Sequence, residues 1–145
     1  MAKIVIDANV IISAAFGGKP LEAMVRAMGE HEVYLSPSIE RELHETISGL
    51  SKKLSGDQID FVREKIEQLL GIPKRISVST HVVLSRDAKD DHYLSLCKEA
   101  GADFLMTGDK DLLNIPKETL EKNGISCLII SPHQFLEQRI GDIVD

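Results

Sequence analysis

Short runs of consecutive apolar residues alternate along the chain with longer stretches in which apolar residues recur every three or four positions. Uninterrupted apolar runs are typical of strands buried on both faces of a sheet, whereas the longer spacing predicts amphipathic helices. The runs predict strands at residues 3–7, 33–35, 103–107 and 126–130, and a weaker one at 76–78. The periodic stretches predict helices at residues 9–16, 20–29, 36–50, 55–71, 110–113, from 87 or 89 to 100, after Pro116, and from 131 onward.

Apolar strands that alternate with helical stretches indicate a parallel sheet covered by helices on both faces. The sequence therefore predicts an α/β fold with three layers, α/β/α, around a central, mostly parallel sheet. With 145 residues and a hydrophobic content of 43 %, the chain is long enough for one core. We expect a single domain over residues 1–145.

Acidic residues follow two of the predicted strands. Asp7 comes directly after one apolar run, and Asp109 comes two residues after Thr107 at the end of another. Ligands of parallel sheets bind beyond the carboxyl ends of the strands, so we expect both acids at a binding site. The alternative is that each acid only caps the helix that follows it. Asp111, on the other side of Lys110, is a further candidate for the same group.

The helix before Gly101 carries a second group of acids. Asp90 lies three, four and seven residues before the first three members of the apolar stripe, so it is predicted to point inward. Asp91 is rotated from it by about 100°, toward the edge of the stripe. Asp87 is expected to cap the helix or to precede it. The stripe consists of Tyr93, Leu94, Cys97 and Ala100.

Two further acids, Glu40 and Glu42, border the apolar stripe of the helix at 36–50, and periodicity alone does not choose between them. Carboxylates brought out of water together carry a large desolvation and repulsion cost, which a hard divalent cation such as Mg²⁺ or Mn²⁺ removes. The positive charges beside these acids, which we expect to contact phosphate, are Arg86, Lys89 and Lys110.

Composition narrows the function classes. The formal net charge of −6 argues against a protein that coats nucleic acids, although it is compatible with a nuclease. Cys97 and Cys127 lie in apolar stretches, so we expect reduced core residues of a cytoplasmic protein, with a disulfide as the minor alternative. Asp7 and Asn9 interrupt the N-terminal apolar run, which excludes a signal peptide there, and no other run approaches the length of a membrane span. The five histidines share no spacing typical of zinc sites.

With these residues in place, the chain resembles the PIN-domain nucleases, particularly the small prokaryotic group of toxin components of toxin–antitoxin pairs (VapC-like). The resemblance covers most of the chain. It departs from the family at Ala88, where this group commonly has Pro. The matching segments are Val5-Ile6-Asp7-Ala8-Asn9-Val10, Leu35-Ser36-Pro37, Arg41-Glu42-Leu43, Asp87-Ala88-Lys89-Asp90-Asp91, Gly101-Ala102-Asp103, and Thr107-Gly108-Asp109-Lys110-Asp111-Leu112-Leu113.

The resemblance implies an endoribonuclease that uses Mg²⁺ or Mn²⁺, and it favours Glu42 over Glu40. It also implies an RNA substrate, an antitoxin protein as partner, and a homodimer. We expect Asn9, Ser13 and Asp91 to orient the ligands or to reach the ion through water. The acids that it matches to catalysis and metal binding are Asp7, Glu42, Asp90 and Asp109, with Asp111 often included.

Two other classes remain open at this stage. A phosphatase with an aspartate nucleophile also begins with an acid at the end of a strand, but its second Asp would stand at the position of Asn9. A catalytically inactive PIN-like module that binds RNA or protein would keep the fold without turnover. The sequence leaves open the RNA target, the number of ions, and whether the nuclease is a toxin or an RNA-processing enzyme.

Overall fold

A computed structural model describes residues 1–84 and 90–137. Within them five strands form one sheet in the order β3-β2-β1-β4-β5, and every neighbouring pair is parallel. The strands are β1 (Lys3–Ile6), β2 (Glu32–Leu35), β3 (Lys74–Arg75), β4 (Phe104–Met106) and β5 (Leu128–Ile130). The helices are α1 (Ala8–Ala14), α2 (Gly18–Glu30), α3 (Pro37–Leu50), α4 (Gly56–Leu70), α5 (Asp91–Ala100), α6 (Lys110–Leu113), α7 (Lys117–Lys122) and α8 (Pro132–Glu137).

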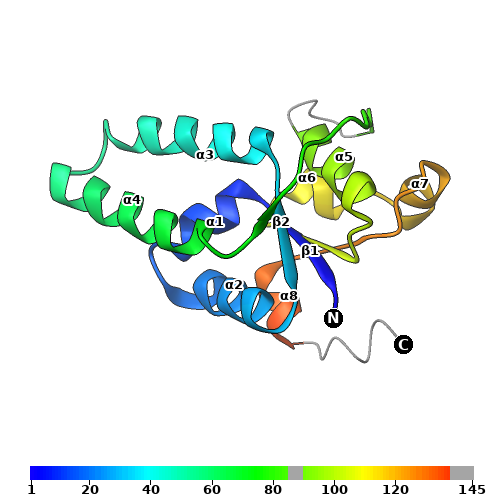
Figure 1. Ribbon diagram of the computed structural model, residues 1–145, viewed down its shortest axis with the longest axis horizontal. Coiled ribbons are helices and arrows are strands. Elements are labelled where there is room, and N and C mark those ends of the chain that lie inside the picture. Colours follow the sequence, from blue (N-terminus) through cyan, green and yellow to red (C-terminus); the bar gives the residue numbers. More distant parts are fainter. Residues whose placement is uncertain (85–89, 138–145) are drawn as a thin grey trace.

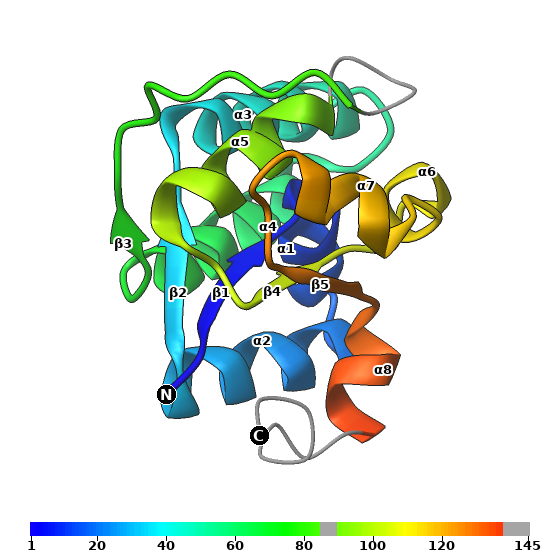
Figure 2. The ribbon, with the colours of Figure 1, turned by 90° about the vertical axis from the view of Figure 1, so that its right-hand side faces the viewer.

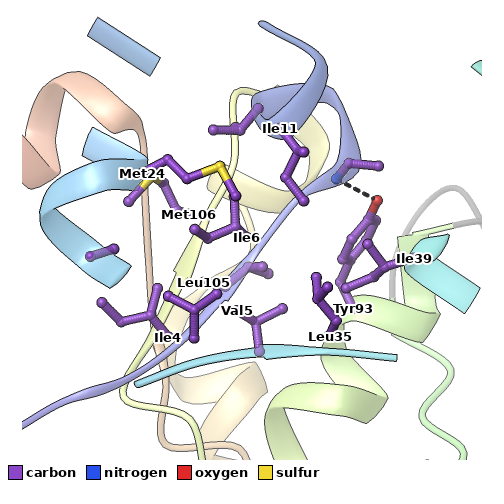
Figure 3. Packing of buried hydrophobic residues seen from close by; sticks show 14 of the residues in the cluster. Ile4, Val5, Ile6, Ile11, Met24, Leu35, Ile39, Tyr93, Leu105 and Met106 are labelled. Carbon is purple, nitrogen blue, oxygen red and sulfur yellow. Dashed lines mark hydrogen bonds between the residues drawn. The ribbon is translucent and has the colours of Figure 1, made fainter. Parts of the chain in front are cut away.

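The three-layer α/β/α architecture that the sequence predicts is confirmed. Helices α2 and α8 lie against each other on one side of the sheet, and α5 packs over β1 and β4 on the other (Figures 1 and 2). Strand β1 is central and pairs with both β2 and β4. Its side chains Ile4, Val5 and Ile6 are completely buried, because helices cover both faces of the sheet (Figure 3).

Local sequence explains where several helices begin. Ser36 accepts a hydrogen bond from Ile39 N at the start of α3, and Ser55 forms the predicted capping box with Gln58 at the start of α4. Helix α5 ends at Gly101, whose φ of 63° is the left-handed conformation that glycine adopts readily.

The structure corrects the weak strand predicted at 76–78. Strand β3 lies at Lys74–Arg75 instead, where its backbone pairs with β2 at the border of the sheet. The two side chains are exposed, so the segment has no apolar run by which the sequence could reveal it. The predicted start of α5 at residue 87 or 89 lies outside the described residues, as do Arg86, Asp87, Ala88 and Lys89.

Two further findings concern the whole described chain. Cys97 and Cys127 are both buried and are not joined by a disulfide, as predicted. None of the helices in residues 1–84 and 90–137 is long and apolar enough to cross a membrane.

Candidate functional site

Asp7 is the centre of the candidate site. It follows β1, caps α1 by accepting a hydrogen bond from Asn9 N (2.9 Å), and is only 2 % exposed. Its second oxygen accepts a hydrogen bond from Thr107 Oγ1 (2.6 Å). No Lys, Arg or His side chain in the described parts of the chain forms an ion pair with Asp7. Both hydrogen-bond partners of this buried side chain are neutral groups, so the described protein places no counter-charge in direct contact with it.

Thr107 connects Asp7 to the turn after β4. Its hydroxyl also accepts a hydrogen bond from Asp109 N (3.0 Å), so one buried side chain holds both strand ends together. Asp109 caps α6 by accepting a hydrogen bond from Asp111 N (2.8 Å). Asp109 is half-buried, whereas Asp111 is exposed. Asp7 and Asp109 therefore do cap the helices that follow them, as the alternative interpretation of the sequence expected, and both also lie at the carboxyl end of the sheet.

Tyr93 connects Glu42 to the turn that carries Asp7. The Tyr93 hydroxyl accepts a hydrogen bond from Ala8 N (3.0 Å) and donates one to Glu42 Oε2. His92 Nε2 lies 3.3 Å from the same Glu42 oxygen. Glu40, in contrast, pairs with Arg75 (2.5 Å). Of the two candidate glutamates on α3, the structure thus connects Glu42 to the site.

Burial and negative charge govern the ionisation of the two rings on α5. The pKa of Tyr93 is raised far above its usual range, mainly by burial and then by the nearby Asp7 and the bond to Glu42. The phenol therefore stays neutral and remains a hydrogen-bond donor. The pKa of His92 is lowered by burial, which outweighs the opposing effect of Glu42 and Asp7.

Asp90 and Asp91 stand at the start of α5, and both are buried, at 8 % and 7 % exposure. The periodicity placed Asp91 toward the edge of the apolar stripe; its burial is explained by the preceding segment, from which Leu84 N donates to Asp91 Oδ1 (3.1 Å). Asn9 and Ser13 are exposed. Asn9 contacts Asp7 through its backbone N–H, which any residue except proline would supply at that position.

The described residues contain no group of three or more His, Cys, Asp or Glu side chains arranged to hold a metal ion. The acids at the carboxyl end of the sheet are instead connected by hydrogen bonds to shared neutral side chains. Thr107 connects Asp7 to the backbone of Asp109, and Tyr93 connects the turn after Asp7 to Glu42.

Two hollows adjoin these acids. One of about 310 Å³ is lined by Ser38, Arg41, Glu42, Glu45 and His92. A second, of about 510 Å³, shares Ser38, Arg41 and His92 with the first and also reaches Asp91. The shared residues make the two hollows neighbours along one side of Glu42, where an extended ligand has room beside the acids.

A family model described as PIN domain matches residues 3–111 of the chain. The chain belongs to the PIN-domain family. Every acid at issue, from Asp7 to Asp111, falls within the matched residues of this PIN domain. None of the curated proteins compared with the chain matches it.

Solved structures show the same fold. One of them is a chain in the crystal structure of VapBC2 from Rickettsia felis, in which the complex is bound to a DNA fragment from its promoter. The TM-score is 0.61 at 14 % identity, and the match covers 89 % of this PIN domain and 98 % of that chain. A domain of a functionally unknown protein from Methanocaldococcus jannaschii has a TM-score of 0.54 at 17 % identity, over 89 % and 91 % of the two chains. At these identities the likeness concerns the fold.

Sequence reasoning missed the groups that connect the acids. Tyr93 was assigned only to the apolar stripe of its helix, and Thr107 only to the end of a strand. A usable signal did exist for both, because a buried hydroxyl must find a hydrogen-bond partner. Which partner it finds depends on segments about a hundred residues apart for Thr107 and Asp7, and no local pattern records that.

Proposed function

We propose that this PIN domain is a divalent-metal-dependent endoribonuclease that hydrolyses RNA phosphodiester bonds. One observation carries the proposal. Asp7, a buried carboxylate at the carboxyl end of the sheet, is linked to Asp109 through Thr107, and its turn is linked to Glu42 through Tyr93. Membership of the PIN-domain family supports the same conclusion.

The chemistry of the donor set fits Mg²⁺ or Mn²⁺. All the proposed ligands are carboxylate oxygens, which hard cations prefer. Mg²⁺ keeps several of its waters and is usually held by only one or two carboxylates, so it does not require a cage of three side chains. We propose that the ion is held directly or through water by Asp7, Glu42, Asp90, Asp109 and Asp111.

The chain itself contributes orientation. Asn9 N and Thr107 Oγ1 fix the two oxygens of Asp7, so this carboxylate is in place before RNA arrives. Arg41, exposed at the rim of both hollows, offers a charged donor to a phosphate of the bound strand. Asp111 completes the acidic set or orients the attacking water. A bound divalent ion would lower the pKa of that water and neutralise charge that builds on the phosphate.

The direct test is cleavage of single-stranded and structured RNA by the purified protein with Mn²⁺, with Mg²⁺, and with EDTA. We expect metal-dependent cleavage that Asp7→Asn abolishes while far-ultraviolet circular dichroism shows a retained fold. Asp60→Asn, which removes the same charge at an exposed position of α4, should cleave like the wild type. Full metal-dependent activity in a folded Asp7→Asn variant would refute the assignment.

The proposal extends to partners. A VapBC2 complex is among the structures with this fold, and on that ground we propose a toxin role with an antitoxin partner. The cytoplasmic location and the homodimer are proposed from the resemblance to the VapC-like group alone. Expression in a bacterial host should then arrest growth, and Asp7→Asn should relieve the arrest. Unimpaired growth with an active nuclease would instead favour an RNA-processing role. Sedimentation as a monomer would refute the homodimer.

A further inference from the structure

We infer that Tyr93 is a positioning residue of the candidate site: its hydroxyl fixes Glu42 in the orientation that binds a divalent cation. The inference rests on the proposed nuclease function, and it adds to the acids a residue that is neither acidic nor exposed.

The geometry around the Tyr93 hydroxyl joins three separate segments. The ring is completely buried on α5 among core side chains such as Ile39 and Leu35, and its hydroxyl reaches Ala8 N (Figure 3). The same hydroxyl donates to Glu42 Oε2 on α3. Ala8 directly follows Asp7, so one phenol sets the place of Glu42 relative to the Asp7 turn.

The two bonds of this hydroxyl are complementary. An N–H donates to its oxygen, which leaves its own proton for a carboxylate. Glu42 Oε2 is thereby engaged by Tyr93 and lies 3.3 Å from His92 Nε2. Among the described residues no protein group is hydrogen-bonded to Glu42 Oε1, so that oxygen is left to a ligand. Partners that orient metal-binding carboxylates in this way typically change metal affinity about 10–100-fold when removed.

The chain offers a matched control. It contains two tyrosines, and Tyr34 also donates a hydrogen bond to a glutamate, Glu32 Oε2 (2.8 Å). That pair lies on β2, and neither of its side chains forms a hydrogen bond or an ion pair with Asp7 or Glu42. Tyr34→Phe therefore removes the same kind of bond without touching the candidate site.

The first test is Mn²⁺ affinity, measured by electron paramagnetic resonance for the wild type, Tyr93→Phe and Tyr34→Phe, with folding checked by circular dichroism. We expect Tyr93→Phe to weaken Mn²⁺ binding at least about 10-fold and Tyr34→Phe to leave it unchanged. A residue that only holds the helices together would lower thermal stability without changing the affinity of the folded protein. Equal affinity in folded Tyr93→Phe would overturn the inference.

A double-mutant comparison tests whether Tyr93 acts through Glu42. In a Glu42→Gln background, Tyr93→Phe should lower Mn²⁺ affinity by less than about twofold, because the group that it orients is already changed. If the two losses simply multiply, the hydroxyl does not act through Glu42 and the inference is wrong.

If Tyr93→Phe does not fold, the wild type labelled with 3-fluorotyrosine decides. It should give two ¹⁹F signals, and Tyr34→Phe assigns them by removing one. Titration with Mg²⁺ should shift the Tyr93 signal and leave that of Tyr34 in place; an unmoved Tyr93 signal at saturating Mg²⁺ would overturn the inference. Wild-type protein that cleaves RNA with Mn²⁺ but shows no dependence on Tyr93 would reject this inference alone. Wild-type protein that neither binds Mn²⁺ nor cleaves RNA would reject the nuclease function and the inference together.

Discussion

Acidic side chains at the two ends of the central sheet have different hydrogen-bond and ion-pair partners. At the amino end, Asp103 Oδ2 accepts a hydrogen bond from Lys3 N (2.8 Å), and Glu32 pairs with Lys74 (2.9 Å) while accepting a bond from Tyr34. At the carboxyl end, Asp7 is 2 % exposed and has no ion pair within residues 1–84 and 90–137.

The contrast between Glu32 and Asp7 separates an acid that the chain compensates with a lysine from one that has only neutral partners. The pKa of Glu32 is lowered first by its hydrogen bond with Lys74, so this acid is stabilised as a carboxylate by the protein. Around Asp7 the partners are a hydroxyl and a backbone N–H, which are neutral. Counter-charge at the carboxyl end is therefore expected to come from a bound cation.

The largest expected effect compares the two glutamates that accept a bond from a tyrosine. Glu42→Gln should lower kcat/KM for RNA on the order of 100-fold, because it removes a charge proposed to hold the ion. Glu32→Gln should leave kcat/KM within about twofold, since Glu32 lies at the other end of the sheet. Equal losses of kcat/KM in the two variants would contradict the proposed difference between Glu42 and Glu32.

The second expected effect concerns stability in the absence of metal, measured by urea unfolding. Tyr93→Phe leaves Ala8 N and Glu42 without their buried partner and should cost about 1–3 kcal/mol. Tyr34→Phe, at a half-exposed position, should cost less than about 1 kcal/mol. A larger loss for Tyr34→Phe would show that the bond between Tyr34 and Glu32 stabilises the fold more than the bonds of Tyr93 do.

The smallest expected effect is the pH dependence that the amino end contributes. His31 Nδ1 accepts a hydrogen bond from Ala2 N (3.0 Å), and the pKa of His31 is lowered, chiefly by burial. Because the unfolded chain then binds a proton more readily, the free energy of unfolding should fall as pH drops below about 6.5. His31→Asn keeps an acceptor and should make this slope shallower, as measured by urea unfolding between pH 7.5 and 5.5. An unchanged slope would exclude His31 as its source.

The sequence predicted the parts of this molecule that depend on local patterns. Apolar runs and helical periodicity predicted the parallel three-layer fold, and position after a strand predicted Asp7 and Asp109 at the carboxyl end. Strand β3 was not predicted, because Lys74 and Arg75 are exposed and only backbone pairing with β2 defines the strand.

The connections within the site depend on tertiary contacts and were not predictable from periodicity. Glu40 and Glu42 border the same stripe, and only the distant partners Arg75 and Tyr93 distinguish them. Asp87, which we expected to cap the helix or to precede it, lies outside the described residues.

The most direct test of cation binding at the carboxyl end is calorimetric titration of Mn²⁺ into the wild type and Asp7→Asn, with Asp103→Asn as the control from the amino end. We predict that the wild type and Asp103→Asn bind Mn²⁺ with the same affinity and that Asp7→Asn no longer binds Mn²⁺. Absence of binding to the wild type, or equal binding to all three proteins, would contradict a cation site built around Asp7.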